Sequence, residues 1–348
     1  MSQYSIIGID LAKRNFSIVA IDENRKAILK KSITREDFFL KFLPEFSKPQ
    51  TFAFEACGGC HYVAQVLQEL SHKVIVLKPK DVKAYAKSKQ KNDSNDALAI
   101  CKAALDPELM RVKTKTKQQQ EVSYLHKTRQ NTIQQRVQTS NALITSLMEF
   151  GYIVKCGKSK FAMNCVNYVE EALKGQYFDE SIYQQMLVEC QKIEALFVRQ
   201  YELDKLIVQK NKESELAIKL ETIPGIGPIN ASILSNKPME IYTSAKHFAA
   251  SLGLVPQQFT TGGEIKLGSI TKQGDRYART MLIQGARSIV MRSHRKDYSK
   301  KTDAIYQFIE RLENKGKGFN VVCVAVANKL ARIAYGCCAN KAEYSAKA

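Results

Sequence analysis

The chain has 348 residues, of which 45% are hydrophobic, so it is long enough for two or three folded domains and is not expected to be disordered. Its 53 Lys and Arg outnumber 34 Asp and Glu, and the formal charge of +19 favours a polyanionic partner, with nucleic acid first. No apolar stretch approaches the roughly 20 residues that span a bilayer, and the N-terminus lacks a signal-peptide pattern, which predicts a cytoplasmic protein with no membrane partner.

The N-terminal third alternates between strand and helix patterns. Residues 4–10, 15–22 and 26–32 are rich in β-formers and are separated by short polar turns, which predicts three sequential antiparallel strands. The segments expected after them are a helix at 35–46, a strand at 51–55, a helix at 62–70, a strand at 73–77, and helical sequence at 82–88 and 94–105. This order is typical of a ribonuclease-H-like α/β domain.

Four acidic residues occupy positions that suit a shared site. Asp10 and Glu55 each end an apolar run, where a strand would bring a carboxylate to the edge of a sheet, and Asp93 and Asp96 share one helix face through their i,i+3 spacing. Carboxylates that lie this close need a compensating positive charge, and Mg²⁺ is the cation that oxygen ligands commonly hold. The sequence therefore predicts a divalent-metal site at Asp10, Glu55, Asp93 and Asp96.

Cysteines offer one motif, Cys57-Gly-Gly-Cys60-His61, which matches a haem-attachment pattern and half a zinc site. Haem attachment requires export, and zinc requires a second ligand pair at suitable spacing that the sequence lacks. We interpret the motif as a turn between a strand and a helix, and the nine cysteines as reduced thiols.

Residues 113–220 are polar and helical, with two long amphipathic segments interrupted around 151–175. In the second segment Ile193, Leu196, Leu203 and Ile207 follow an a/d-like spacing, which predicts a helical hairpin or short coiled coil. Fewer than three or four heptads are sustained, so a packed spacer is favoured over a dimerisation element, and both stay open.

The segment Ile223-Pro224-Gly225-Ile226-Gly227-Pro228 has the form of the hairpin in a helix-hairpin-helix. In that motif glycines let the backbone approach a DNA phosphate, so Gly225 and Gly227 are candidate nucleic-acid contacts. The alternative is an ordinary tight turn between two helices.

A glycine-broken, hydroxyl-rich loop follows, and it leads into a basic helix. Thr260, Thr261 and Ser269 belong to the loop. Three cations come directly after it, and they are the candidate phosphate contacts: Lys272, Arg276 and Arg279.

Five motifs in this order resemble the DEDD insertion-sequence transposases, relatives of the pilin-gene invertase. The motifs are Gly-Ile-Asp, Phe-Glu-Ala-Cys-Gly-Gly, Lys-Asn-Asp-Ser-Asn-Asp-Ala, Ile-Pro-Gly-Ile-Gly-Pro, and Gly-Leu-Val-Pro with Thr-Gly-Gly and Ile-Thr-Lys-Gln-Gly-Asp. The resemblance covers residues 4–335. It implies a RuvC-like DEDD catalytic domain at 1–112, a helical or coiled-coil region at 113–218, and a mainly α C-terminal transposase domain at 219–348 with a helix-hairpin-helix-like motif and the nucleophile loop.

The activity implied by the resemblance is that of a DNA recombinase that excises and inserts its own element. Its implied cofactor is Mg²⁺ or Mn²⁺, held by the four acids. Its implied partners are DNA at the element ends and target, a non-coding guide RNA, and further copies of the chain in a dimer or tetramer. The family attacks DNA with a serine before a glycine; Thr261 stands at that position here, and Thr260 and Ser269 are the alternative nucleophiles.

Two other functions fit the same residues. A RuvC-like structure-selective nuclease would use the carboxylates to activate water and would need no C-terminal hydroxyl. A non-catalytic nucleic-acid-binding protein would use the acids only as structural caps, and it would leave DNA connectivity unchanged when Mg²⁺ is added.

Overall fold

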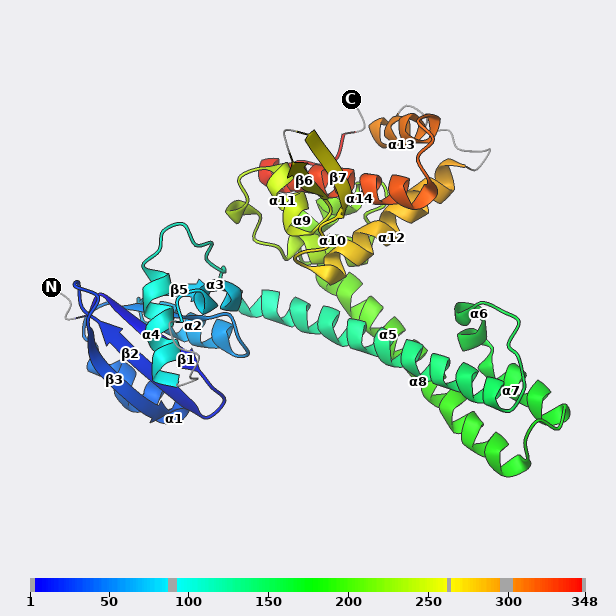
Figure 1. The fold of residues 1–348 in the computed structure, drawn as a ribbon, viewed down its shortest axis with the longest axis horizontal. Helices are drawn as coiled ribbons and strands as arrows, with labels where there is room; N and C mark the ends of the chain where they lie inside the picture. The colour runs from blue at the N-terminus through cyan, green and yellow to red at the C-terminus, as the bar shows by residue number, and fades with distance from the viewer. Residues whose placement is uncertain (1–3, 87–92, 262–263, 295–302, 346–348) are drawn as a thin grey trace. The chain divides into compact units, whose positions relative to one another are not determined.

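The computed structural model describes residues 4–86, 93–261, 264–294 and 303–345 (Figure 1). Contacts between residues divide the chain into two compact units, Met1–Gln120 and Glu121–Ala348. Each unit has hydrophobic cores of its own, and each is described here by itself.

The first unit contains a mixed five-stranded sheet. Its strands are β1 (Ile6–Leu11), β2 (Asn15–Ile21), β3 (Ala27–Thr34), β4 (Thr51–Glu55) and β5 (Lys73–Leu77). Their order in the sheet is β3-β2-β1-β4-β5. β2 pairs antiparallel with β1 and β3, whereas β4 pairs parallel with β1 and β5. The three sequential antiparallel strands and the two later strands predicted from the sequence are confirmed.

Helices cover both faces of this sheet. They are α1 (Arg35–Asp37), the π-helix η1 (Phe38–Phe42), the 3₁₀ helix η2 (Leu43–Glu45), α2 (Cys60–Glu69), α3 (Pro79–Lys83) and α4 (Asp93–Ala104). One core joins the sheet to η1 and α2, and the other joins its opposite face to α3 and α4. The helix predicted at 35–46 is therefore three short helical segments of different pitch, in which Phe38 stacks on Phe42. The end of the segment predicted at 82–88 lies outside the described residues.

The second unit is mostly helical. Its helices are α5 (Lys117–Glu149), which begins at the end of the first unit, α6 (Lys158–Met163), α7 (Cys165–Lys174), α8 (Glu180–Asn211), α9 (Glu215–Glu221), α10 (Pro228–Ser235), η3 (Met239–Ile241), α11 (Ala245–Ser251), α12 (Arg276–Ser293), α13 (Ala304–Asn314) and α14 (Phe319–Asn340). The two long helices α5 and α8 confirm the predicted pair of amphipathic segments. The interruption between them contains α6 and α7. The C-terminal end of α5 and the N-terminal end of α8 share a hydrophobic core with these short helices.

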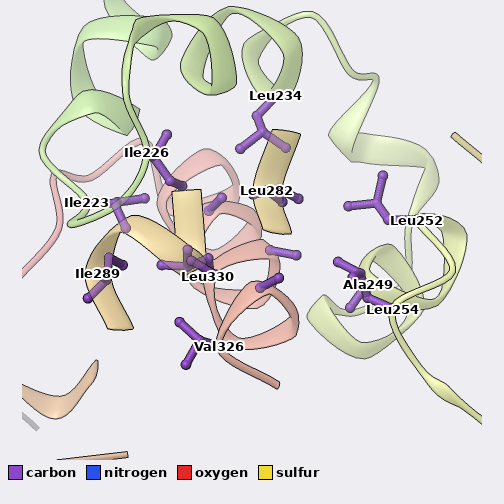
Figure 2. Packing of buried hydrophobic residues seen from close by; sticks show 14 of the residues in the cluster. Ile223, Ile226, Leu234, Ala249, Leu252, Leu254, Leu282, Ile289, Val326 and Leu330 are labelled. Carbon is purple, nitrogen blue, oxygen red and sulfur yellow. The ribbon is translucent and has the colours of Figure 1, made fainter. Parts of the chain in front are cut away.

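A separate core lies under the C-terminal helices (Figure 2). Ile223 and Ile226 flank the turn between α9 and α10 and are buried against α12 and α14, whose Leu282, Ile289 and Leu330 are also buried. Close packing at this point depends on glycine, because a Cβ added to Gly285 of α12 would collide with the backbone carbonyl of Gly225.

The helix α14 corrects the expectation that no apolar stretch has membrane-spanning length. Among the described residues it alone is long and apolar enough, by length and composition, to cross a membrane, with a mean hydropathy of 1.5. Half of its most apolar window is buried inside the unit, where Val322, Val326 and Leu330 belong to the core. Core helices of this kind meet the same criterion, because burial in protein and in lipid favours similar side chains.

Two strands, β6 (Pro256–Thr261) and β7 (Glu264–Ile270), form an antiparallel hairpin. The sequence predicted an irregular glycine-broken loop here, and that prediction is wrong for the residues on either side of the tip. In β7, Ile265 and Leu267 alternate with Glu264 and Lys266, and β6 ends in the β-formers Phe259, Thr260 and Thr261, a β pattern that the glycines concealed.

Candidate carboxylate site

Strand pairing places Asp10 beside Glu55. β1 and β4 run parallel with Gly8 opposite Ala53 and Ile9 opposite Phe54, so one further step along both strands brings Asp10 opposite Glu55. Both residues stand near the carboxyl ends of their strands. Because side chains alternate along a strand, Asp10 lies on the same face as Gly8, and Glu55 lies on the same face as Ala53.

That face is the one covered by α4. A Cβ at Gly8 would lie 2.5 Å from the carbonyl oxygen of Ala97 and 2.5 Å from Cys101 Sγ, so only glycine lets the helix approach β1 this closely. Cys101 Sγ donates to the carbonyl of Val19 at 3.3 Å and ties the helix to the next strand. The close approach carries Asp96, the residue before Ala97, toward the ends of β1 and β4.

The pKa of Glu55 reflects the proximity of the other two acids. Its pKa is raised above the ordinary 4.5, first by burial of the carboxyl group and then by the negative charges of Asp10 and Asp96. The structure thus brings Asp10, Glu55 and Asp96 into electrostatic contact, which we call the carboxylate site. Asp93 is the first residue of α4, and its side chain lies outside the described part of the structure.

The donor chemistry of the site fits a hard cation, because every side chain supplies carboxylate oxygens. Among the described side chains, however, no three of His, Cys, Asp or Glu lie close enough together to hold a metal ion. The described carboxylates therefore repel one another electrostatically, but they do not by themselves form a closed ligand shell. The fourth predicted ligand is the one that is not described.

A turn follows Glu55, as the sequence predicted for Cys57-Gly-Gly-Cys60-His61. Gly59 has φ +89°, in the left-handed region that favours glycine, and α2 begins at Cys60. All nine cysteines are free thiols. Burial lowers the pKa of His61, and His61 Nδ1 accepts a hydrogen bond from the backbone N–H of Lys115 at 3.3 Å. These contacts give the motif an ordinary structural role.

The candidate nucleophiles lie on the β6–β7 hairpin. Thr261 ends β6 and pairs in register with Glu264, but its side chain lies outside the described part of the structure, as do Gly262 and Gly263 entirely. Thr260 and Ser269 are exposed, and Thr260 Oγ1 accepts a hydrogen bond from Gln258 Nε2 at 3.3 Å. The three candidate nucleophiles therefore belong to the two paired strands of this hairpin, Thr260 and Thr261 to β6 and Ser269 to β7.

The predicted phosphate-binding cations divide into two kinds. Lys272 and Arg276 are exposed, and Lys272 adopts φ +54°, an uncommon conformation for a residue with a side chain. Arg279 is only 8% exposed, and its Nη1 donates to the carbonyls of Leu252 at 2.9 Å and Gln273 at 3.1 Å. The structure thus argues against the predicted phosphate contact of Arg279, because its guanidinium faces inward and holds the Lys272 loop against α11.

Packing against α12 explains why the first glycine of the turn between α9 and α10, Gly225, is a glycine. Gly225 has φ +82°, and an added Cβ would collide with Ile289 of α12. Gly227 is exposed and precedes α10, and a Cβ there would meet no atom within 4 Å. Internal packing therefore accounts for Gly225 without a ligand, whereas Gly227 leaves its backbone accessible. The phosphate contacts of both residues stay predictions.

Sequence reasoning missed a buried polar network in the second unit. His126 lies between the hydroxyls of Tyr277, 3.3 Å from Nδ1, and Ser232, 3.0 Å from Nε2. Arg129 pairs with Asp204, and its Nη1 donates to the same Tyr277 hydroxyl at 3.3 Å. The sequence shows no local pattern for this network, because Tyr277 lies about 150 positions from His126 and Arg129. The one available signal was the spacing of His126 and Arg129, which lie one turn apart on the same helix.

Comparison with known proteins gives two family matches. The DEDD transposase model of IS110 matches residues 7–151, and the model described as transposase IS116/IS110/IS902 family matches residues 217–302. The first match contains the carboxylate site, and the second contains the β6–β7 hairpin and the basic helix.

Similar proteins extend the match over nearly the whole chain. A probable family 20 transposase of Pseudomonas aeruginosa is 36% identical over 337 residues, which cover 94% of this chain and 95% of that protein. The transposase for insertion sequence element IS1328 of Yersinia enterocolitica is 33% identical over 96% of this chain and 97% of its own length. The pilin gene-inverting protein of Moraxella bovis is 30% identical over 119 residues, or 33% of this chain and 34% of that protein.

Proposed function

Because the chain belongs to the IS116/IS110/IS902 family of insertion-sequence transposases, we propose that it cuts and rejoins the DNA of its own element with the help of a divalent cation at the carboxylate site. The observation that carries this proposal is the convergence of Asp10, Glu55 and Asp96; the pKa of Glu55 is raised by burial and then by the charges of the other two acids. Acids that repel one another inside a fold are a feature of functional sites more than of structural ones.

The order of the first unit's sheet supports a ribonuclease-H-like or RuvC-like assignment. Three antiparallel strands followed by two parallel ones put the central strand, β1, next to β4, and the two strands carry Asp10 and Glu55. Asp93 and Asp96 would complete the ligand set from the first turn of α4. A bound Mg²⁺ or Mn²⁺ would stabilise negative charge that develops on the scissile phosphate.

In the proposed reaction a side-chain hydroxyl is the nucleophile. Its oxygen attacks the phosphorus, one P–O bond to the DNA strand breaks, and the departing DNA hydroxyl takes up a proton, so the phosphodiester energy is kept in a protein–DNA ester for rejoining. Thr261 is our first choice, because it occupies the serine position of the family and ends β6 at the hairpin tip. Thr260 is the second and Ser269 the third.

Charge supports the proposed partners. The chain carries +19, and Lys272 and Arg276 expose cations next to β7, where they can neutralise phosphates of DNA at the element ends and target. A guide RNA and a dimeric or tetrameric assembly belong to the proposal through the family resemblance. We also retain the division into a catalytic domain, a helical region and a C-terminal domain, and the helix-hairpin-helix assignment, as parts of it.

The test is to trap the protein–DNA ester. The full-length protein is incubated with Mg²⁺ and DNA that carries the element ends, and the reaction is stopped in denaturant and analysed for DNA bound to protein. We expect adducts for the wild type and for Thr261→Ser, and none for Thr261→Ala, which still binds DNA. Thr260→Ala and Ser269→Ala are the matched controls.

Each other outcome changes the proposal in a defined way. Adducts that persist in Thr261→Ala and vanish in one control move the nucleophile to that residue. Cleavage without any adduct, in the wild type as in all variants, replaces the recombinase with a nuclease that uses water.

A further inference from the structure

Three segments meet beside the carboxylate site in the first unit. The turn at residues 12–14 follows β1, the loop at 56–59 follows β4, and α1 follows β3. The backbone N–H of Arg35 donates to the carbonyl of Arg14 at 2.7 Å, and Cys57 Sγ donates to the carbonyl of Leu11 at 3.7 Å. The first two segments begin within two residues of Asp10 and Glu55, so whatever binds across them lies next to the acids.

Arg35 is held in place by aromatic rings. Its guanidinium carbon lies 5.7 Å from the centroid of Phe16, 6.0 Å from that of Phe39 and 5.7 Å from that of Tyr62. Its Nη1 also lies 3.6 Å from where a Cβ of Gly59 would be, so the guanidinium reaches the loop after Glu55. A cation fixed by several rings loses little conformational freedom when it binds a ligand.

The outer ring of this group is available to solvent. Tyr62 is 50% exposed, although it is a large side chain in the first turn of α2, and its contact with Phe39 is edge-on with ring centroids 5.9 Å apart. The neighbouring loop is also open, because a Cβ at Gly58 would meet no atom within 4 Å. An exposed tyrosine that is braced on one side by an arginine and a second ring is a suitable stacking platform.

The segments that meet here carry three cations: Arg35, which contacts the Tyr62 ring, and Lys13 and Arg14 in the turn whose carbonyl at Arg14 binds the backbone of Arg35. Lys13 and Arg14 are exposed, and no described carboxylate lies within ion-pair distance of Lys13, Arg14 or Arg35. Solvated cations beside an exposed ring match a chain of phosphates that carries unpaired bases, since proteins bind single strands by combining stacking with backbone neutralisation. A duplex offers the phosphates but hides the faces of its bases.

We propose that Lys13, Arg14, Arg35 and Tyr62 form a subsite for single-stranded nucleic acid, in which one unpaired base stacks on Tyr62 and the cations bind the flanking phosphates. The inference rests on the proposed function, because it assigns the strand that reaches the carboxylate site. A strand held there has its backbone led toward Asp10 and Glu55. The subsite also implies that DNA is melted, or a strand displaced, before it is cut.

The test measures binding without cutting. Full-length protein in metal-free buffer is titrated into a single-stranded DNA oligonucleotide that contains 2-aminopurine, whose fluorescence falls when the base stacks, and into a duplex of the same sequence. We compare the wild type with Tyr62→Ala, Tyr62→Phe and, as matched control, Tyr124→Ala, which removes a tyrosine that is 67% exposed on α5. Thermal unfolding checks that each variant is folded.

We expect Tyr62→Ala to weaken single-strand binding about tenfold and to abolish the fluorescence change, because stacking of one base contributes on the order of a factor of ten. Tyr62→Phe and Tyr124→Ala should bind as the wild type does. The salt dependence of Tyr62→Ala should be unchanged, whereas the double variant Lys13→Ala and Arg14→Ala should lower its slope by up to about two units.

Three outcomes overturn the inference: unchanged single-strand binding by Tyr62→Ala, an equal loss in Tyr124→Ala, or an equal loss of duplex binding. An assay of DNA rejoining by the wild type separates this inference from the proposed function. A wild type that rejoins DNA while Tyr62→Ala binds normally contradicts the subsite alone. A wild type that rejoins no DNA contradicts the proposed function, even where the Tyr62 effect is present.

Discussion

The carboxylate site of the first unit and the buried polar network of the second unit differ in how their charges are compensated. At the carboxylate site, like charges meet, and the pKa of Glu55 is raised by burial and by Asp10 and Asp96. In the network, Arg129 has Asp204 as its partner and His126 has two hydroxyl partners.

Uncompensated charge is expected of a binding site, such as the carboxylate site, whereas paired charges and hydrogen bonds are expected of a structural network. A network whose donors and acceptors are satisfied lowers the free energy of the folded state by itself. A cluster of repelling acids raises it, and such a cluster gains stability only when a cation binds. We therefore expect substitutions at the first site to change activity with little cost in stability, and substitutions in the second unit's polar contacts to do the reverse.

The largest expected effect is a loss of recombination activity at the carboxylate site. If this loss is absent, the carboxylate site does not differ from the buried polar network in the way described. Asp10→Asn removes one carboxylate charge from the end of β1 and should lower DNA recombination by about a thousandfold or more, while thermal unfolding stays within about 1 kcal/mol of the wild type. Recombination is measured by the joined product from a donor and a target plasmid. Activity near the wild-type level in this variant would remove Asp10 from the proposed site.

The second prediction contrasts two arginines of one helix. Arg279→Ala should lower the free energy of unfolding by about 3 kcal/mol, because the carbonyls of Leu252 and Gln273 lose their buried donor. Arg276→Ala should leave stability unchanged and reduce the salt dependence of DNA binding by about one unit. Chemical denaturation and binding titrations at several salt concentrations check the pair. If Arg279→Ala were stable and bound DNA weakly, Arg279 would belong to the nucleic-acid surface after all.

The third prediction concerns the pH dependence of stability that the buried polar network confers through His126. Burial, and then the charge of Arg129, lower the pKa of His126 from 6.5 to about 4, so the folded state keeps this histidine neutral while the unfolded state takes up a proton. Stability from His126 is therefore present above pH 6.5 and is lost as the pH falls toward 4, by about 2 kcal/mol between pH 7 and pH 5.

A His126→Gln variant provides the control for this prediction. It should be less stable at pH 7 because the ring's contacts are lost, and its stability should fall less between pH 7 and pH 5. Equal slopes in the two proteins would mean that other groups cause the acid sensitivity.

Much of the first unit could be predicted from sequence because its signals are local. Runs of β-formers separated by short polar turns predicted the strands, and the acids that end two of the apolar runs identified Asp10 and Glu55. The role of Gly8 could not be predicted in this way, since it depends on α4 packing across the strand about 90 positions later in the chain. The same holds for Arg35 and Tyr62, whose contact joins two helices.

The second unit exposed the limits of local patterns more clearly. Arg279 looked like its neighbour Arg276, because a run of cations indicates charge but not direction. Arg276 is exposed and Arg279 is buried although they lie one turn apart on α12, because the Arg279 side chain reaches the carbonyls of Leu252 and Gln273, which come from segments the local pattern does not include. Glycines at the tip of the hairpin likewise suggested an irregular loop, although β6 and β7 pair on both sides of it.

The most direct test of the account is whether a divalent cation relieves the repulsion at the carboxylate site. The thermal midpoint of the full chain is measured at pH 7, without metal and with increasing Mg²⁺, for the wild type and for Glu55→Gln. Without metal, Glu55→Gln should be the more stable protein by less than about 1 kcal/mol, because an ionised Glu55 with a raised pKa costs stability above pH 4.5 and the site is partly screened by solvent. Mg²⁺ at a hundredfold excess over its Kd should stabilise the wild type by about 2.7 kcal/mol and the variant by much less. A wild type that is insensitive to Mg²⁺, or a variant that responds equally, would contradict the account.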